Sequence, residues 1–222
     1  MNLLVKYPTR QRPELFLKTL KEYHDKAFCN AQTTYLVSYD LDDLSMTHEV
    51  IKEAKRYGNV MMIGGSSDNK IHACNRDMDY AKNWDVVLLI SDDMEVQKDG
   101  WDATILMDMD KYYPNGDGVL WYHDGSKQRV ITTLTCMDKK YYSRFGFLYN
   151  PIYKSFFCDN EFTDIARKLN KIKFIDNVII KHQHPQWGGK VKHDELYERN
   201  NAPWKEDQNT YETRKRFNFG LI

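Results

Sequence analysis

Short apolar runs alternate with longer segments of helical periodicity through roughly the first hundred residues of the chain. The runs are rich in β-branched and aliphatic residues, which predicts strands, and the segments between them carry apolar residues at helical spacing. The predicted strands are 3–7, 33–39, 60–63 and 85–90, and the predicted helices are 13–23, 47–57 and 71–82. We expect Pro8 to end the first strand and Thr47 to cap the second helix. Strands that alternate with helices indicate βαβ units and a mostly parallel sheet, so the predicted fold class is α/β.

The pattern changes after Trp101. Helices are predicted over 101–109 and from Asp159 or Asn160 to about 170, and strands over 119–122, 130–135 and 173–180. From position 190 the chain is polar and charged, which predicts an outer extension of helix and loop over 190–222. No internal repeat or long linker divides the sequence. We therefore expect one domain over 1–189, with an α/β half (1–100) and a mixed half (101–189).

Composition narrows the function classes. The chain has 222 residues, with 32 Lys and Arg against 32 Asp and Glu, so no overall basic field attracts nucleic acid or a membrane surface. The four cysteines are widely spaced and form no C-x-x-C pair, which argues against a zinc cluster or a disulfide framework. No apolar run approaches the length of a membrane span, and a strand is predicted almost at once, without a preceding signal peptide. We expect a soluble, cytoplasmic protein.

The motif Ser91-Asp92-Asp93 follows the apolar run 85–90 directly. Such a continuous run is typical of a strand buried on both faces, and its carboxyl end is where an open α/β sheet binds ligands. Adjacent carboxylates repel each other unless a positive group neutralises them, and a divalent cation that carries a diphosphate would do so. The alternative is a solvated acidic turn at the end of the strand, because Asp is a common turn residue.

Several further motifs follow in a fixed order. They are Tyr7-Pro8-Thr9-Arg10-Gln11-Arg12-Pro13, an aspartate after the second strand, Asn69-Lys70-Ile71-His72-Ala73-Cys74-Asn75, Leu89-Ile90-Ser91-Asp92-Asp93 with Gly100-Trp101 behind, Phe157-Cys158-Asp159-Asn160-Glu161-Phe162 and Lys181-His182-Gln183-His184-Pro185. Over roughly 3–185, this series resembles the GT-A glycosyltransferases of family 2, particularly the short versions found in bacteriophages and bacteria. The resemblance implies a GT-A fold, a nucleotide-sugar-binding half over 1–100 and an acceptor and catalytic half over 101–189.

The resemblance also implies which residues bind the donor. Thr9 and Arg10 would contact the nucleotide, and Asp40 would hold the uracil and ribose, although Asp42 or Asp43 could take that role. The segment with Lys70 and Asn75 would line the nucleotide pocket. In the family's D-x-D motif the first acid often reads the ribose and the last one binds Mg²⁺ or Mn²⁺. Ser91 stands in the first place here, so the metal ligand would be Asp93, and Asp92 would contact the ribose or support a metal ligand.

For the remaining motifs, the resemblance implies roles in catalysis and metal binding. Asp159 would be the general base that takes the proton of the acceptor hydroxyl, and Glu161 would help to position the acceptor. The alternative for Asp159 is that it and Asn160 only cap the following helix. Relatives often complete the metal shell with a histidine near the last strand. His182 would be that ligand, with His184 as the alternative, because the two point to opposite faces if the strand continues.

The predicted function is a Mn²⁺- or Mg²⁺-dependent inverting glycosyltransferase with a nucleotide-sugar donor, UDP-linked by expectation. A nucleotidyltransferase is the first alternative, but it would carry G-x-G-x-R after the first strand, where this chain has Pro8-Thr9-Arg10-Gln11. A non-catalytic nucleotide-sugar-binding module is the second. The acceptor is open: a hydroxymethylated base in phage DNA, a surface polysaccharide or a protein hydroxyl. A phage protein would act in the host cytoplasm.

Overall fold

The computed structural model describes residues 1–126, 129–183 and 195–221. Within them, a seven-stranded sheet has the order β3-β2-β1-β4-β7-β6-β8. Its strands are β1 (Leu3–Thr9), β2 (Thr33–Asp40), β3 (Val60–Gly65), β4 (Val86–Leu89), β6 (Val119–Tyr122), β7 (Cys136–Asp138) and β8 (Ile172–Ile175). Strand β7 is antiparallel to both of its neighbours, and all other neighbouring strands are parallel. The predicted α/β class with a mostly parallel sheet is confirmed.

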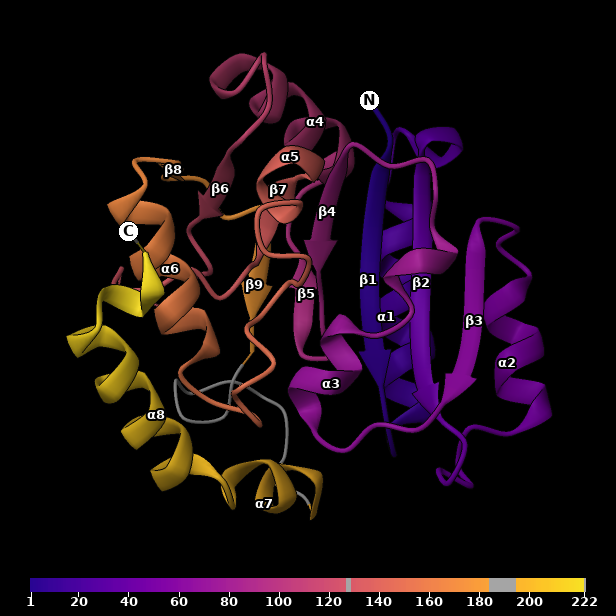
Figure 1. Cartoon of the computed structure of the whole chain (residues 1–222). Helices are drawn as coiled ribbons and strands as arrows, with labels where there is room; N and C mark the ends of the chain where they lie inside the picture. Colours follow the sequence, from indigo (N-terminus) through magenta and orange to yellow (C-terminus); the bar gives the residue numbers. More distant parts are fainter. Residues whose placement is uncertain (127–128, 184–194, 222) are drawn as a thin grey trace.

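Helices cover both faces of this sheet (Figure 1). The helices on one face are α1 (Pro13–Asp25), α2 (His48–Lys55) and α4 (Trp101–Tyr112), and those on the other are α3 (Lys70–Asn75), α5 (Lys139–Tyr142) and α6 (Cys158–Lys168). In β4, Val86 and Leu88 belong to the first core and Val87 and Leu89 to the second. Because both faces are buried, the strand reads as a continuous apolar run rather than an alternating one.

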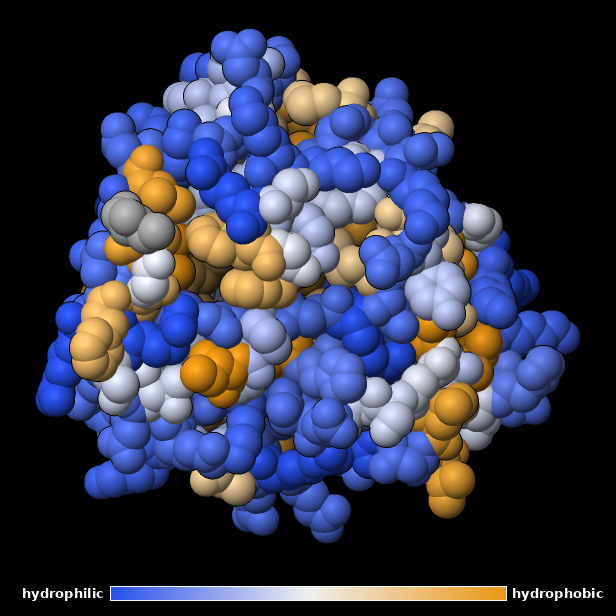
Figure 2. Space-filling view, in the orientation of Figure 1, coloured by the Kyte–Doolittle hydropathy of each residue, from blue (hydrophilic) through white to orange (hydrophobic). Residues whose placement is uncertain are grey.

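The chain ends in two helices that lie beside the second half of the molecule. Helix α7 (Glu195–Asn201) is followed by α8 (Trp204–Arg216), and α8 contacts α6 (Figure 1). No helix in the described part of the chain is long and apolar enough to cross a membrane. The face seen in Figure 2 is mostly hydrophilic, with hydrophobic residues in small groups.

Two boundaries in the first half differ from the prediction. Strand β1 continues through Pro8 to Thr9, and it pairs with β4 only as far as Lys6, so the missing N–H of the proline breaks no bond on that side. Helix α3 ends at Asn75, and a 3₁₀ turn (Met78–Tyr80) follows Asp77, whose φ of 70° lies in the left-handed region. The expected cap is present, since the Thr47 side chain accepts a hydrogen bond from the N–H of Val50.

The second half differs more. The paired strand near 130–135 is β7, which begins only at Cys136. The predicted strand 173–180 is two strands in different sheets, β8 and β9 (Ile180–His182), and β9 pairs antiparallel with β5 (Met94–Val96). Helix α6 begins at Cys158 with Phe157 at the N-cap, so neither Asp159 nor Asn160 caps it. The break between β8 and β9 matters because it brings His182 to the end of β4.

Candidate functional site

A cavity of about 370 Å³ lies at the carboxyl ends of β1, β2 and β4. The chain leaves β1 toward β2 on one side of the sheet and returns to β4 on the other, so the cavity lies at the switch point where open α/β sheets bind ligands. Of the residues predicted to form the site, those in its wall are Thr9, Arg10, Asp40, Lys70, Asp92, Asp93, Asp159 and His182. The structure therefore brings most of the predicted site together. His184 lies outside the described residues.

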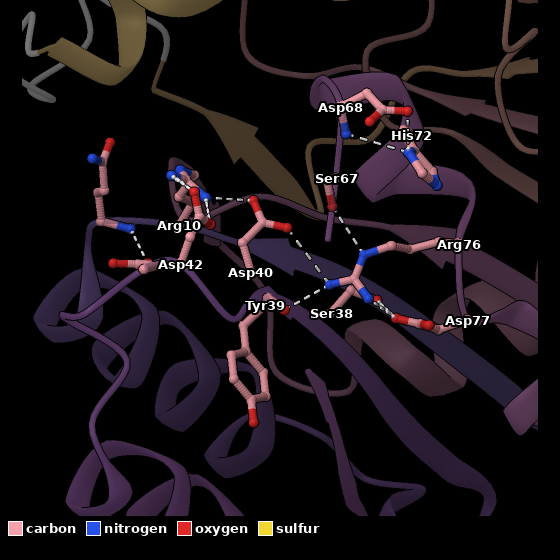
Figure 3. A network of polar contacts seen from close by, with 12 residues as sticks. Arg10, Ser38, Tyr39, Asp40, Asp42, Ser67, Asp68, His72, Arg76 and Asp77 are labelled. Atoms are coloured by element: carbon pink, nitrogen blue, oxygen red, sulfur yellow. Dashed lines mark hydrogen bonds and ion pairs between the residues drawn. The ribbon is translucent and has the colours of Figure 1, made fainter. Parts of the chain in front are cut away.

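The carboxylate of Asp40 lines the cavity and belongs to the network of polar contacts drawn in Figure 3. Its Oδ2 accepts a hydrogen bond of 2.8 Å from Nη1 of Arg10, and its Oδ1 lies 3.8 Å from Nη2 of Arg76. Oδ1 of Asp40 and Oγ1 of Thr9 are both buried and have no hydrogen-bond partner among the described residues. A buried polar atom without a partner is rare, and here an acceptor and a hydroxyl are left for a ligand.

The two alternatives to Asp40 occupy different places. The Asp42 carboxylate accepts bonds of 2.6 and 2.9 Å from Arg10, but its side chain is 73% exposed. The Asp43 carboxylate is used by backbone groups, because it accepts bonds from the N–H of Ser45 in its own loop and from the N–H of Gln11 after β1. Neither lines the cavity, and Asp40 does.

A second network behind Asp40 was not predicted from the sequence. Arg76 donates to the carbonyl of Tyr39 (2.7 Å) and to Asp77 (2.7 Å), as Figure 3 shows. Ser38, which lines the cavity, donates to the same Asp77 carboxylate (2.6 Å) and accepts from Nζ of Lys6. Burial lowers the pKa of Lys6 to about 8, although Asp77 opposes the shift. A lysine inside the apolar run of β1 was the one sequence signal for this network.

The acidic motif and His182 meet through a strand pair. Met94 of β5 pairs with His182 of β9, which places His182 beside Asp93 although these two residues are 89 positions apart in the chain. Nε2 of His182 lies 3.3 Å from Oδ2 of Asp93, and the Ser91 hydroxyl donates to Oδ1 of Asp93. Burial alone would raise the pKa of Asp93, but the contact with His182 and the bond from Ser91 outweigh it and hold the pKa well below its ordinary value. Asp93 is thus an anion that faces the cavity.

The donors near Asp93 fit a cation that is shared with a ligand. Across residues 1–126, 129–183 and 195–221, no group of three or more His, Cys, Asp and Glu side chains could hold a metal ion by itself. Asp93 and His182 supply a carboxylate and an imidazole, the donors that Mn²⁺ accepts in a mixed shell, and Mg²⁺ prefers oxygen. The remaining positions would have to come from water or from the oxygens of a bound phosphate.

Asp159 stands in the first turn of α6, where it lines the cavity. Its Oδ1 accepts a bond of 2.9 Å from the N–H of Asn160. Burial raises the pKa of Asp159, and the positive charge of Lys70, which also lines the cavity, counteracts part of that shift. A carboxylate with a raised pKa is a stronger base than an ordinary aspartate, so Asp159 is suited to take a proton from a hydroxyl group.

Glu161 points away from the cavity. Its side chain is 2% exposed and accepts bonds from Nδ2 of Asn150 (2.8 Å), the hydroxyl of Tyr153 (2.8 Å) and Nε and Nη2 of Arg214 (2.6 and 3.0 Å). These bonds use both carboxylate oxygens and none of them involves the cavity. Glu161 therefore anchors α6 to α8 and does not line the cavity, in contrast to its predicted role in positioning the acceptor.

Asn75 also lies outside the cavity wall. Its Oδ1 accepts from the N–H groups of Leu148 (2.9 Å) and Tyr149 (3.0 Å), and its Nδ2 donates to the carbonyl of Tyr149 (2.6 Å). The side chain therefore fixes the loop that presents Tyr149 to the cavity. The segment predicted to line the nucleotide pocket thus reaches the cavity through Lys70, whereas Asn75 acts on it through Tyr149.

The architecture and the cavity define an α/β fold with a ligand-sized cavity at the switch point of the sheet, and solved structures with the GT-A fold share this architecture. The structure of S. aureus TarS 1–349 in complex with UDP-GlcNAc is similar, with a TM-score of 0.67 and 15% sequence identity over 88% of this chain and 60% of that one. The mannosyltransferase PcManGT from Pyrobaculum calidifontis in complex with GDP-Man and Mn²⁺ has a TM-score of 0.65 and 12% identity over 85% of this chain and 58% of that one. This chain thus spans about 60% of the length of the TarS fragment. No protein-family model and no curated protein matches the sequence. The likeness confirms the predicted fold.

Proposed function

We propose that this protein is a metal-dependent, inverting glycosyltransferase that uses a nucleotide-sugar donor. One observation carries the proposal: a single cavity joins the open polar atoms of Thr9 and Asp40, the Asp93–His182 pair and the carboxylate of Asp159. These are groups for a nucleobase, a diphosphate-bound cation and an acceptor hydroxyl. The fold shared with glycosyltransferases that hold UDP-GlcNAc or GDP-Man supports the same function.

The part of the cavity around Thr9 and Asp40, which would bind the nucleobase, favours a uridine donor. Oδ1 of Asp40 can only accept a hydrogen bond when it is ionised, and the Thr9 hydroxyl can donate one. Uracil has an N–H between two carbonyl oxygens and so offers a matching donor and acceptor. Guanine also has an N–H next to a carbonyl, whereas N3 of cytosine is an acceptor and would face the carboxylate unfavourably. UDP-sugars are therefore the first donors to test and GDP-sugars the second.

The cation would be held by Asp93 and His182, with His184 as the alternative predicted from the sequence. When bound, Mn²⁺ or Mg²⁺ neutralises the negative charge of the departing nucleoside diphosphate. Asp92 also lines the cavity, and its Oδ2 lies 3.8 Å from Nη1 of Arg12. Arg12 and Lys70 bring positive charge to the same wall, where a diphosphate would lie.

Asp159 would act on the acceptor. The acceptor oxygen forms a bond to the anomeric carbon while the bond from that carbon to the phosphate oxygen breaks, and the hydroxyl proton passes to Asp159. Attack opposite the leaving group inverts the anomeric configuration. The acceptor itself, whether a glycan, a protein hydroxyl or a hydroxymethylated base in phage DNA, stays a prediction from the sequence.

The proposal is tested by the release of nucleotide from a panel of UDP-, GDP- and CDP-sugars with Mn²⁺. We expect turnover with a UDP-sugar, with water as acceptor where no better one is supplied, and a loss of about 100-fold in Asp93→Asn, in the range of removing one charge-stabilising group. Asp99→Asn is the matched control, because Asp99 is an exposed carboxylate on the same segment. No release from any member of the panel, or equal rates in both variants, would refute the proposal.

A further inference from the structure

The carboxylate of Asp207, in α8, holds the backbone just before α6. Asp207 is 1% exposed. Its Oδ1 accepts a bond of 3.0 Å from the N–H of Lys154, and its Oδ2 accepts bonds of 2.8 Å from the N–H groups of Ser155 and Phe156. One buried side chain thus fixes three consecutive peptide groups, and hydrogen bonds to an ionised acceptor are among the stronger ones in proteins.

The next residue, Phe157, has an unusual backbone. Its φ of 59° and ψ of −2° lie in the left-handed region, which a bulky residue adopts only when its surroundings hold it there. Two rings of the C-terminal segment do so: Tyr211 is stacked on the Phe157 ring and Trp204 meets it edge-on, each with ring centroids 5.6 Å apart. This conformation turns the chain into α6, two residues before Asp159.

Helix α8 also holds the other side of Asp159. Arg214 forms the two hydrogen bonds with Glu161 described above, and the Tyr211 hydroxyl donates to Asp164 (2.7 Å). Helix α8 therefore contacts the chain on both sides of Asp159: Asp207 binds the residues that precede it, and Arg214 binds Glu161, which follows it. A catalytic group that is misplaced by about 1 Å can lose about 100-fold in rate.

We propose that α8 positions Asp159 for catalysis and that Asp207 is the main positioning residue. This inference rests on the proposed function, because it takes Asp159 to be the base. Asp207 does not line the cavity, so it would act through the loop 154–157 and not by touching the substrate. Trp204 does line the cavity and contacts Phe157, so α8 touches both the cavity and the turn that leads to Asp159.

The test is a double-mutant cycle on nucleotide release, with Mn²⁺ and the fastest nucleotide sugar of the panel. We expect Asp207→Ala to lower kcat by about 100-fold, while its Kd for UDP stays within about twofold of the wild type. Asp207→Asn keeps one acceptor oxygen and should lie between the two. Glu206→Gln is the matched control, because the exposed Glu206 neighbours Asp207 and its carboxylate contacts the Lys154 side chain (2.7 Å) instead of the backbone N–H groups that Asp207 binds. Its rate should equal that of the wild type.

The cycle separates positioning from general weakening. In the Asp159→Asn background, Asp207→Ala should reduce the remaining rate no further, because the two residues act on one step. Multiplicative losses would overturn the positioning role. Amide hydrogen exchange is the readout without turnover: Asp207→Ala should speed exchange at 154–159 and leave the β1 and β4 amides unchanged. Absence of turnover in the wild type would refute the proposed function alone, whereas unchanged exchange at 154–159 would overturn the role of Asp207.

Discussion

The proposed nucleobase site around Asp40 gives the sharpest prediction. Asp40→Asn replaces a carboxylate that is 7% exposed and bonded to Arg10 with an amide of the same shape. Of the two polar atoms of the new amide, only the carbonyl oxygen can accept from Arg10, so the amide nitrogen would turn to the cavity in place of Oδ1. It would present a donor to the N–H of uracil and a suitable partner to N3 of cytosine.

The magnitude follows from the contact that is lost. A hydrogen bond to a charged group contributes about 1.5–3 kcal/mol, which corresponds to about 10- to 150-fold in affinity. We therefore expect the Kd for UDP, measured by titration calorimetry with Mn²⁺, to rise by that factor, and the preference for UDP over CDP to disappear. The control is Asp42→Asn, which removes the 73%-exposed partner of the same arginine and should leave the Kd unchanged. Equal affinities for UDP in the wild type and Asp40→Asn would refute this account of the nucleobase site.

Three further predictions concern the metal, the pH dependence and the fold. His182→Ala should raise the Mn²⁺ concentration that gives half-maximal nucleotide release, by about 10-fold or more for a lost metal-site group, and chelation should abolish release; an unchanged titration would exclude His182. Because burial raises the pKa of Asp159, kcat should fall as the pH drops through a value above the ordinary aspartate pKa of about 3.9; a flat kcat profile across that range would contradict the base assignment. Arg214→Ala leaves the buried Glu161 carboxylate without its counter-charge and should lower the free energy of unfolding by about 3–5 kcal/mol in urea titrations; the exposed Arg216→Ala serves as control, and an equal effect of both would contradict the anchor.

The strands and the acidic motif could be predicted because they depend on local pattern. The apolar run of β4 is continuous because helices cover both faces of the sheet, and this is visible in the sequence. The motif that follows it then had to lie at the carboxyl edge. Local pattern also misled: the predicted helix from 71 ends at Asn75, because Asp77 takes a left-handed backbone conformation and starts a separate turn.

Helix geometry accounts for the position of Glu161 outside the cavity. Residues two apart in a helix point to nearly opposite sides, so a carboxylate at 161 cannot share the cavity that Asp159 lines. Helical geometry alone places the Glu161 side chain on the side of α6 that faces away from the cavity. The sequence offered no such rule for Asp207, which sits in a polar segment and resembles a solvated residue until α8 is placed against the loop 154–156.

The pairing of Asp93 with His182 could not be predicted as a contact. Both residues were candidates, but the β5–β9 pair that joins them consists of two strands of three residues each. The sequence suggested a single longer strand over 173–180, and such a strand would have carried the histidine elsewhere. Short strands contribute little pattern, so contacts between distant segments had to come from the structure.

The central claim is that Asp159 serves as the base in a cavity that binds a nucleotide sugar. The most direct test compares Asp159→Asn with the wild type in two quantities from one preparation, the Kd for UDP and the kcat of nucleotide release. The account predicts an unchanged Kd and a kcat lower by about 10²- to 10⁴-fold, the usual contribution of general base catalysis. A variant that binds UDP and releases nucleotide at the wild-type rate would contradict it.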